Sequence, residues 1–99
     1  PFMSVGAEGV ISVASNIIPR QLSRMVNSYA TGKTAASLKL HQQYYPMFRD
    51  LFIETNPVPA KAALAMQGKC AEEYRLPLCK MSVDNRKRLA KTLKSCGVI

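Results

Sequence analysis

The feature that most constrains the fold is one short apolar segment, residues 9–16, with the sequence Gly-Val-Ile-Ser-Val-Ala-Ser-Asn. Small and β-branched residues between a glycine and a Ser-Asn pair are typical of a strand buried in a parallel sheet. We predict a strand over 10–14, and no other stretch predicts one convincingly. A strand needs a neighbour for its ladder hydrogen bonds. The sequence therefore indicates the end of a larger α/β protein whose other strands lie outside these residues.

Side chains of the predicted strand alternate between its two faces. Val10, Ser12 and Ala14 share one face, and the small side chains among them suit a crowded barrel interior. Ile11 and Val13 share the other face and, being bulky, are expected to pack under the surrounding helices.

Helices are predicted for most of the remaining chain, because apolar residues recur there at helical spacing between glycine and proline boundaries. We expect the last turns of a helix over 1–6, and further helices over 19–31, 34–53, 59–67 and 83–96. Pro46 falls inside the third of these, where it should bend the helix without dividing it. Ser82 is a good N-cap for the last helix, whose apolar stripe should start at Val83.

The composition favours a soluble cytoplasmic protein over a secreted, membrane or zinc-binding one. Cys70, Cys79 and Cys96 are odd in number and lack CxxC spacing, so reduced thiols are expected. His41 is the single histidine, and no Cys/His group has the spacing of metal ligands. No apolar run approaches the roughly 20 residues that span a bilayer.

The formal net charge of +8 raises the alternative of a small basic module that binds nucleic acid or a partner protein. The charges are dispersed, however, and only Arg86-Lys87-Arg88 forms a run. A solvated helix face accounts for that run, so nucleic acid is not the partner we expect.

Three segments in this order and spacing carry a resemblance to a known family: Gly9-Val10-Ile11-Ser12-Val13-Ala14-Ser15-Asn16, Glu54-Thr55-Asn56-Pro57-Val58-Pro59-Ala60-Lys61, and Leu76-Pro77-Leu78 before a Ser-capped terminal helix. On these residues the chain resembles the dihydrodipicolinate synthase family over essentially its whole length, which corresponds to roughly the last third of that family's chain. Sister pyruvate aldolases such as N-acetylneuraminate lyase share the architecture and remain an alternative.

The resemblance implies the C-terminal part of a TIM (β/α)8 barrel followed by a helical domain. Residues 1–32 would hold the end of helix seven, strand eight and helix eight, and residues 33–99 the C-terminal helical domain. The intact enzyme would condense pyruvate with L-aspartate 4-semialdehyde in lysine (diaminopimelate) biosynthesis. It would be a cytoplasmic lyase, commonly a homotetramer, that needs no cofactor because a barrel lysine forms a Schiff base with pyruvate.

Very little of that chemistry falls on this sequence. The resemblance implies one substrate-binding residue, Ile11, which would line the pyruvate pocket through its main chain; its alternative is an ordinary core position. No catalytic residue and no metal ligand is carried over, because the Schiff-base lysine and its tyrosine relay belong to earlier strands. These 99 residues alone should therefore be inactive and should contribute barrel closure and one pocket wall.

The residues themselves offer few further candidates. A Schiff-base lysine must lose its charge in a desolvated site, whereas Lys61 begins a helix and the other lysines lie on polar faces. Tyr44 falls on an apolar stripe, so packing is expected in place of proton relay. Ser15 and Asn16 are expected to cap or turn the chain, with direct ligand contact as the alternative.

Overall fold

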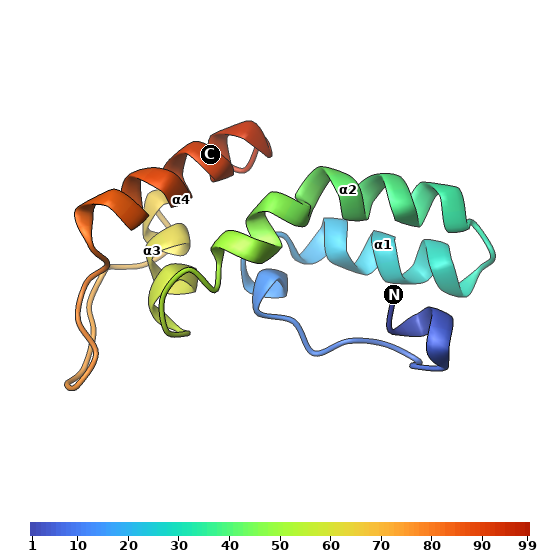
Figure 1. Ribbon diagram of the computed structural model, residues 1–99, viewed down its shortest axis with the longest axis horizontal. Coiled ribbons are helices and arrows are strands. Elements are labelled where there is room, and N and C mark those ends of the chain that lie inside the picture. The colour runs from blue at the N-terminus through green and yellow to red at the C-terminus, as the bar shows by residue number, and fades with distance from the viewer.

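The computed structural model describes all 99 residues and contains four α-helices, two short 3-10 turns and no assigned strand. In chain order the elements are η1 (Met3–Val5), η2 (Val13–Asn16), α1 (Pro19–Ala30), α2 (Thr34–Asp50), α3 (Val58–Met66) and α4 (Val83–Ser95). Figure 1 shows an elongated molecule in which α1 and α2 lie antiparallel at one end, and α3 and α4 lie at the other. An extended segment runs below α1 from η1 to η2.

The predicted strand over 10–14 is not formed as a strand. Ser12 has extended backbone angles (φ −128°, ψ 130°), but Val13 and Ala14 already belong to the η2 turn. Residues 8–11 make no backbone–backbone hydrogen bond. A strand is defined by its pairing with a neighbour, and no other part of these residues pairs with this segment. The extended conformation was thus predicted correctly up to Ser12, but the hydrogen bonds to a neighbouring strand are absent.

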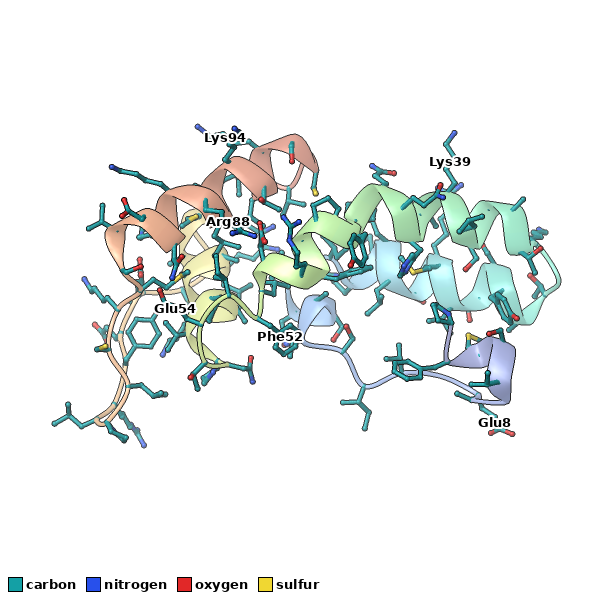
Figure 2. All side chains as sticks on the ribbon, in the orientation of Figure 1. Glu8, Lys39, Phe52, Glu54, Arg88 and Lys94 are labelled. Atoms are coloured by element: carbon teal, nitrogen blue, oxygen red, sulfur yellow. The ribbon has the colours of Figure 1, made fainter.

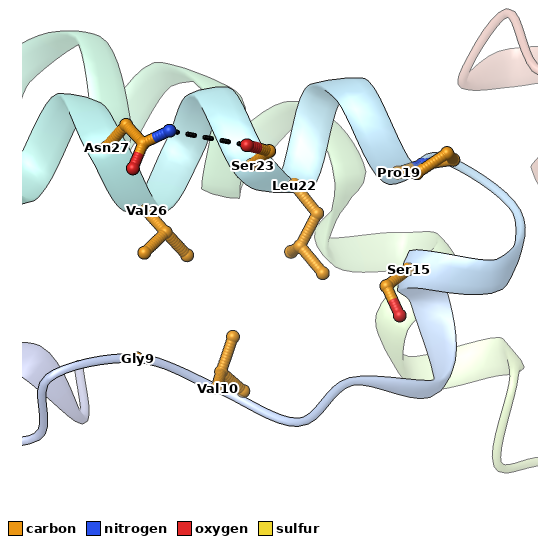
Figure 3. A pocket seen from close by; sticks show the side chains of 8 residues that line it. All are labelled: Gly9, Val10, Ser15, Pro19, Leu22, Ser23, Val26 and Asn27. Carbon is orange, nitrogen blue, oxygen red and sulfur yellow. Dashed lines mark hydrogen bonds between the residues drawn. The ribbon is translucent and has the colours of Figure 1, made fainter.

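The expected facing of this segment was wrong. Val10 and Ser12 point toward the helices and line the cavity under α1 and α2, whereas the side chain of Ile11 is fully exposed on the opposite side. Figure 3 shows Val10 directed toward Leu22 and Val26 of α1. The alternation of a strand fixes which residues share a face but not which face is covered.

The helices form close to where the sequence predicts them. Pro19 occupies the first turn of α1, where its missing N–H costs nothing. Gly32 has a φ of 77°, a left-handed conformation that turns the chain from α1 into α2. Helix α2 continues through Pro46 but ends at Asp50, three residues earlier than expected. The start of the chain is only the short η1 turn, which Gly6 closes with a φ of 102°.

One expectation for α4 was also wrong, because Val83 is 68% exposed. Ser82 does cap the helix through its Oγ, which accepts a hydrogen bond from the backbone N–H of Asn85. At 3.6 residues per turn, Val83 lies on a different side of α4 from Leu89 and Leu93, which are both completely buried.

One hydrophobic core joins the two ends of the molecule. It draws on η2, the second half of α2, α3 and α4, and comprises Ala14, Ile17, Ile18, Tyr44, Met47, Leu51, Val58, Ala60, Ala62, Ala63, Met81, Leu89, Leu93 and Cys96. Small alanines on α3 allow neighbouring elements to approach closely. The core therefore anchors α3 against η2, at the end of the extended segment. The division into 1–32 and 33–99 remains a prediction.

Candidate functional site

The candidate site lies where the extended segment ends and η2 begins. A cavity of about 350 Å³ opens between this segment and α1 (Figure 3). Its walls come from the segment, from η2 and from the first turns of α1, and consist of Gly9, Val10, Ser15, Pro19, Leu22, Ser23, Val26 and Asn27. No lysine, histidine or carboxylate lines it, so the cavity itself carries no acid–base or nucleophilic chemistry.

Ile11 is the one residue that the sequence analysis placed in a substrate pocket. Its side chain points away from α1 into open space, and its backbone N–H and C=O have no hydrogen-bonding partner. Free main-chain groups at the end of an extended segment can pair with a neighbouring strand or bind a ligand. The geometry leaves both uses open to Ile11, and its role as a binding residue stays a prediction.

Ser15 and Asn16 act as turn residues, as expected. The Ser15 hydroxyl donates to the carbonyl oxygen of Ser12 at 2.5 Å, and the Asn16 amide donates to that of Val13 at 3.0 Å. Both side chains therefore bond to backbone carbonyls at the start of η2, and the Ser12 carbonyl also accepts from the Ser15 backbone N–H at 3.2 Å. Ser15 also lines the cavity, so the alternative of direct ligand contact stays a prediction.

The other candidates resolve as structural residues. Tyr44 is buried in the core, which confirms the packing interpretation. The Lys61 ammonium lies 5.7 Å from the centre of the Tyr74 ring, in a cation–π contact. His41 is half-buried on α2, beside Tyr45 and with its ring centre 5.9 Å from that of Phe48. No lysine lines the cavity of about 700 Å³ between the N-terminal segment and the α1–α2 pair either.

A buried carboxylate that the sequence analysis missed joins α2 to α4. The Asp50 side chain is 1% exposed and accepts hydrogen bonds from Arg49 Nε at 2.8 Å, Arg88 Nη2 at 2.9 Å and Thr92 Oγ1 at 2.7 Å. Burial alone would raise the pKa of Asp50, but these three donors outweigh it and hold the pKa well below its usual range. Asp50 follows Met47 by three positions and so lies on the buried side of α2. This helical spacing is the sequence signal that could have predicted its burial.

Two further polar contacts hold the N-terminal end of α4. Glu54 Oε1 accepts from the Ser82 backbone N–H at 3.0 Å, the Ser82 hydroxyl at 3.1 Å and Asn85 Nδ2 at 2.8 Å. The hydrogen bond from Asn85 is the main reason that the pKa of Glu54 is lowered. Arg86 binds Glu72 through Nη2 at 2.9 Å. Figure 2 shows Glu54 and Arg88 on this side of the molecule, away from the cavity.

The remaining site classes find little support in the structure. No three His, Cys, Asp or Glu side chains converge in a way that could hold a metal ion. No helix has the length and apolar character needed to cross a bilayer. The three cysteines are free: Cys70 and Cys79 are exposed and Cys96 is buried.

Comparison with known proteins gives a consistent result. A model described as the dihydrodipicolinate synthetase family matches residues 1–96. The 4-hydroxy-tetrahydrodipicolinate synthase of Thermodesulfovibrio yellowstonii is 45% identical over 97 residues, which are 98% of this chain and 33% of that protein. The chain thus spans about a third of the length of the curated relatives it matches, their C-terminal third.

Solved structures agree with the sequence matches. The synthase of Methylacidiphilum fumariolicum SolV superposes with a TM-score of 0.96 at 52% identity, covering 98% of this chain and 32% of that one. The chloride-inhibited enzyme of Acinetobacter baumannii, solved in complex with pyruvate, superposes with a TM-score of 0.92 at 33% identity, covering 98% of this chain and 33% of that one. These neighbours are TIM barrels, so the chain has the fold of the last part of such a barrel.

Proposed function

Because the chain belongs to the dihydrodipicolinate synthetase family, we propose that it forms the C-terminal part of a 4-hydroxy-tetrahydrodipicolinate synthase. The intact lyase condenses pyruvate with L-aspartate 4-semialdehyde on the route to lysine. The reaction passes through a Schiff base between pyruvate and a lysine that lies outside these 99 residues. No separate cofactor is needed, since the covalent imine itself withdraws electrons from the pyruvate carbon. The enzyme works in the cytoplasm as a homotetramer.

The observation that carries this proposal is the extended segment over 8–12 beside α1. Its backbone groups are unpaired along residues 8–11, and it leads through η2 into a helix that packs back along it. This is the arrangement of one strand–helix unit whose neighbouring strands are supplied by other residues. In such barrels the active site lies at the carboxyl ends of the strands. In this chain that end is Ser12, next to Ile11.

The exposed side of Ile11 supports the proposal that this segment borders the site. Helix α1 covers the face of Val10, so the face of Ile11 is the one that looks toward the barrel interior. A main-chain N–H or C=O at this position offers a fixed dipole to a bound keto acid and brings no reactive side chain with it. Ile11 would therefore shape and orient the pyruvate pocket while the chemistry is done by residues of earlier strands.

The 99-residue chain alone is expected to be inactive. No lysine lines the candidate site, and no residue of the chain is placed to relay a proton there. The contribution of the chain is to close the barrel and to provide one wall of the pocket.

Borohydride trapping of the full-length protein tests the proposal. Reduction in the presence of pyruvate should attach one pyruvate to one lysine per chain, and peptide mapping should place it outside these 99 residues. The 99-residue chain treated in the same way is the control and should remain unmodified. A full-length protein that gives no adduct, or an adduct on a lysine within this chain, would refute the assignment.

Two rival functions make different predictions. A sister aldolase such as N-acetylneuraminate lyase would also be trapped by pyruvate, but the intact enzyme would then not consume L-aspartate 4-semialdehyde. The relatives named above are synthases, which favours the semialdehyde. A basic nucleic-acid-binding module would bind DNA or RNA at low salt and lose affinity steeply as salt rises. We expect no binding in that titration.

A further inference from the structure

The connection between α3 and α4 is a projecting arm over residues 69–81, which we call the α3–α4 arm. After α3 ends, the chain runs back along that helix, and the Tyr74 hydroxyl donates to the carbonyl oxygen of Val58, the first residue of α3, at 3.1 Å. From there the arm continues past the helix, turns, and returns to Ser82. Figure 1 shows it extending well beyond the α3–α4 pair.

The base of the arm is held by several independent contacts. Arg86 of α4 binds the Glu72 carboxylate through Nε at 3.3 Å and Nη2 at 2.9 Å. Glu54 receives the hydrogen bonds of Ser82 at the other end of the arm. Tyr74 and Leu78 pack against the hydrophobic core. The arm therefore leaves the helical domain in a fixed direction.

The tip of the arm has no such support within this chain. Leu76 is 93% exposed, and Arg75 and Pro77 beside it are also exposed. The one hydrogen bond across the tip joins the Leu78 N–H to the Arg75 carbonyl oxygen at 3.0 Å, which only closes the turn. A single exposed leucine is ordinary on a protein surface. A leucine held in solvent at the end of a fixed arm is better explained by a contact that lies outside these residues.

The direction of the arm indicates where that contact lies. The arm and the extended segment over 8–12 leave the helical layer on the same side (Figure 1). Helix α3, along which the arm runs, packs on η2, which follows the carboxyl end of that segment. Neighbouring strands would pair with the free backbone groups at the two edges of the segment. Because α1 covers the Val10 face, the sheet would close into a barrel on the Ile11 side. The arm thus reaches from the carboxyl end of the segment toward the space that those strands occupy.

We propose that the tip of the α3–α4 arm, with Leu76 as its anchor, docks on the loops at the carboxyl end of the barrel strands, within the same polypeptide. This inference rests on the proposed function, since it takes the missing two thirds of the relatives' length to form that barrel. The face it contacts is the one on which such barrels build their active sites. The arm would position those loops from outside the pocket without touching the reacting atoms.

Thiol labelling in the full-length protein tests the docking. Leu76→Cys is introduced together with Cys70→Ser and Cys79→Ser, and Val83→Cys in the same background is the matched control, because Val83 is also an exposed aliphatic residue. Labelling with a maleimide is followed by mass spectrometry of the peptide that contains each new cysteine. We expect the cysteine at 76 to react at least about tenfold more slowly than the one at 83, and equally fast once both proteins are unfolded in urea.

Hydroxyl-radical footprinting of the unmodified protein covers the case in which the variant does not fold, because it reports the accessibility of the Leu76 side chain itself. Equal labelling of the two native variants, or ready oxidation of Leu76, would overturn the docking. If the protection of position 76 disappears when the protein is diluted, the contact is with a second copy of the protein. That result would overturn the proposed intramolecular docking. Pyruvate trapping of the unmodified protein tests the proposed function separately. Trapping without protection of Leu76 would overturn only the docking.

Discussion

The carboxylate of Asp50 fastens α4 to the end of α2, and its loss should loosen α4 selectively. Asp50→Asn keeps the shape of the side chain and removes its charge. The arginines donate to Oδ1 and the Thr92 hydroxyl donates to Oδ2. An amide keeps only one acceptor oxygen, so the side that its NH2 group faces loses its acceptor as well as the charge. The change therefore removes the charge and one acceptor of the carboxylate with little disturbance of the packing.

The expected loss in free energy of unfolding follows from how exposed each of the three donors is. The Arg49 and Arg88 side chains are 55% and 53% exposed, so each ion pair is screened by solvent and contributes about 0.2–1 kcal/mol. The Thr92 bond is buried, and replacing its charged acceptor by a neutral one removes about 1 kcal/mol. The sum is about 2 kcal/mol, which corresponds to a roughly 30-fold larger opening constant.

Amide hydrogen exchange of α4 in the full-length protein measures this opening directly. Exchange of α4 should accelerate about 10- to 30-fold in Asp50→Asn, while exchange of α1, which makes no contact with Asp50, should not change. Asp84→Asn is the matched control, since Asp84 lies on α4 but forms no ion pair or side-chain hydrogen bond. Exchange in α4 that is equal for the two variants would refute the structural role given to Asp50.

The difference in free energy of unfolding between wild type and Asp50→Asn should also depend on pH. The pKa of Asp50 is lowered in the folded protein, so its stabilising contribution is complete above the unfolded-state pKa of about 3.9. That contribution is lost as the pH falls below about 4 toward the folded-state pKa. The difference in free energy of unfolding between the two proteins should therefore be constant near neutral pH and decrease in acid. A difference that increases as the pH falls would contradict this linkage.

Three further outcomes are expected. Leu93→Ala should cost about 2–5 kcal/mol because Leu93 is completely buried, whereas Val83→Ala should stay within about 0.5 kcal/mol, both measured by chemical denaturation. Ser82→Ala removes the N-cap of α4 and should cost about 1 kcal/mol, visible as faster exchange in the first turn, while Ser23→Ala, on the exposed face of α1, should not alter that turn. The isolated 99-residue chain should be helical but bind a hydrophobic dye and melt broadly, and a sharp cooperative transition would contradict this.

Helix positions could be predicted from the sequence because their signals are local. Gly32 ends α1 and Ser82 caps α4 through contacts within a few residues, and the structure confirms both. The extended segment and its lack of a partner within these residues were also predicted, but the η2 turn that replaces the end of the strand from Val13 onward was not. The burial of Asp50 could not be predicted locally either, because its partner Arg88 is 38 positions away.

The candidate site shows the same division. The sequence located it at the end of the 10–14 segment, but it assigned the faces of Ile11 and Val10 the wrong way round. Size was the guide to that assignment, and size does not distinguish a residue under a helix from one in a barrel interior, because both environments are apolar. The decisive information is the position of α1, which is a tertiary property.

Polar groups that have partners within these residues and polar groups that lack them lie in different parts of the molecule. Asp50 and Glu54 each accept three hydrogen bonds from partners within these residues, and both connect to α4. The backbone of residues 8–11 has no partner at all, and the side chain of Ile11 is left in solvent. The stabilising contacts therefore lie where α2, α3 and α4 meet. The unpaired backbone groups lie along the segment that would border an active site. If the proposed barrel is formed, pairing of this backbone would also bury Ile11, so on that proposal assembly of the barrel would itself form the pocket wall.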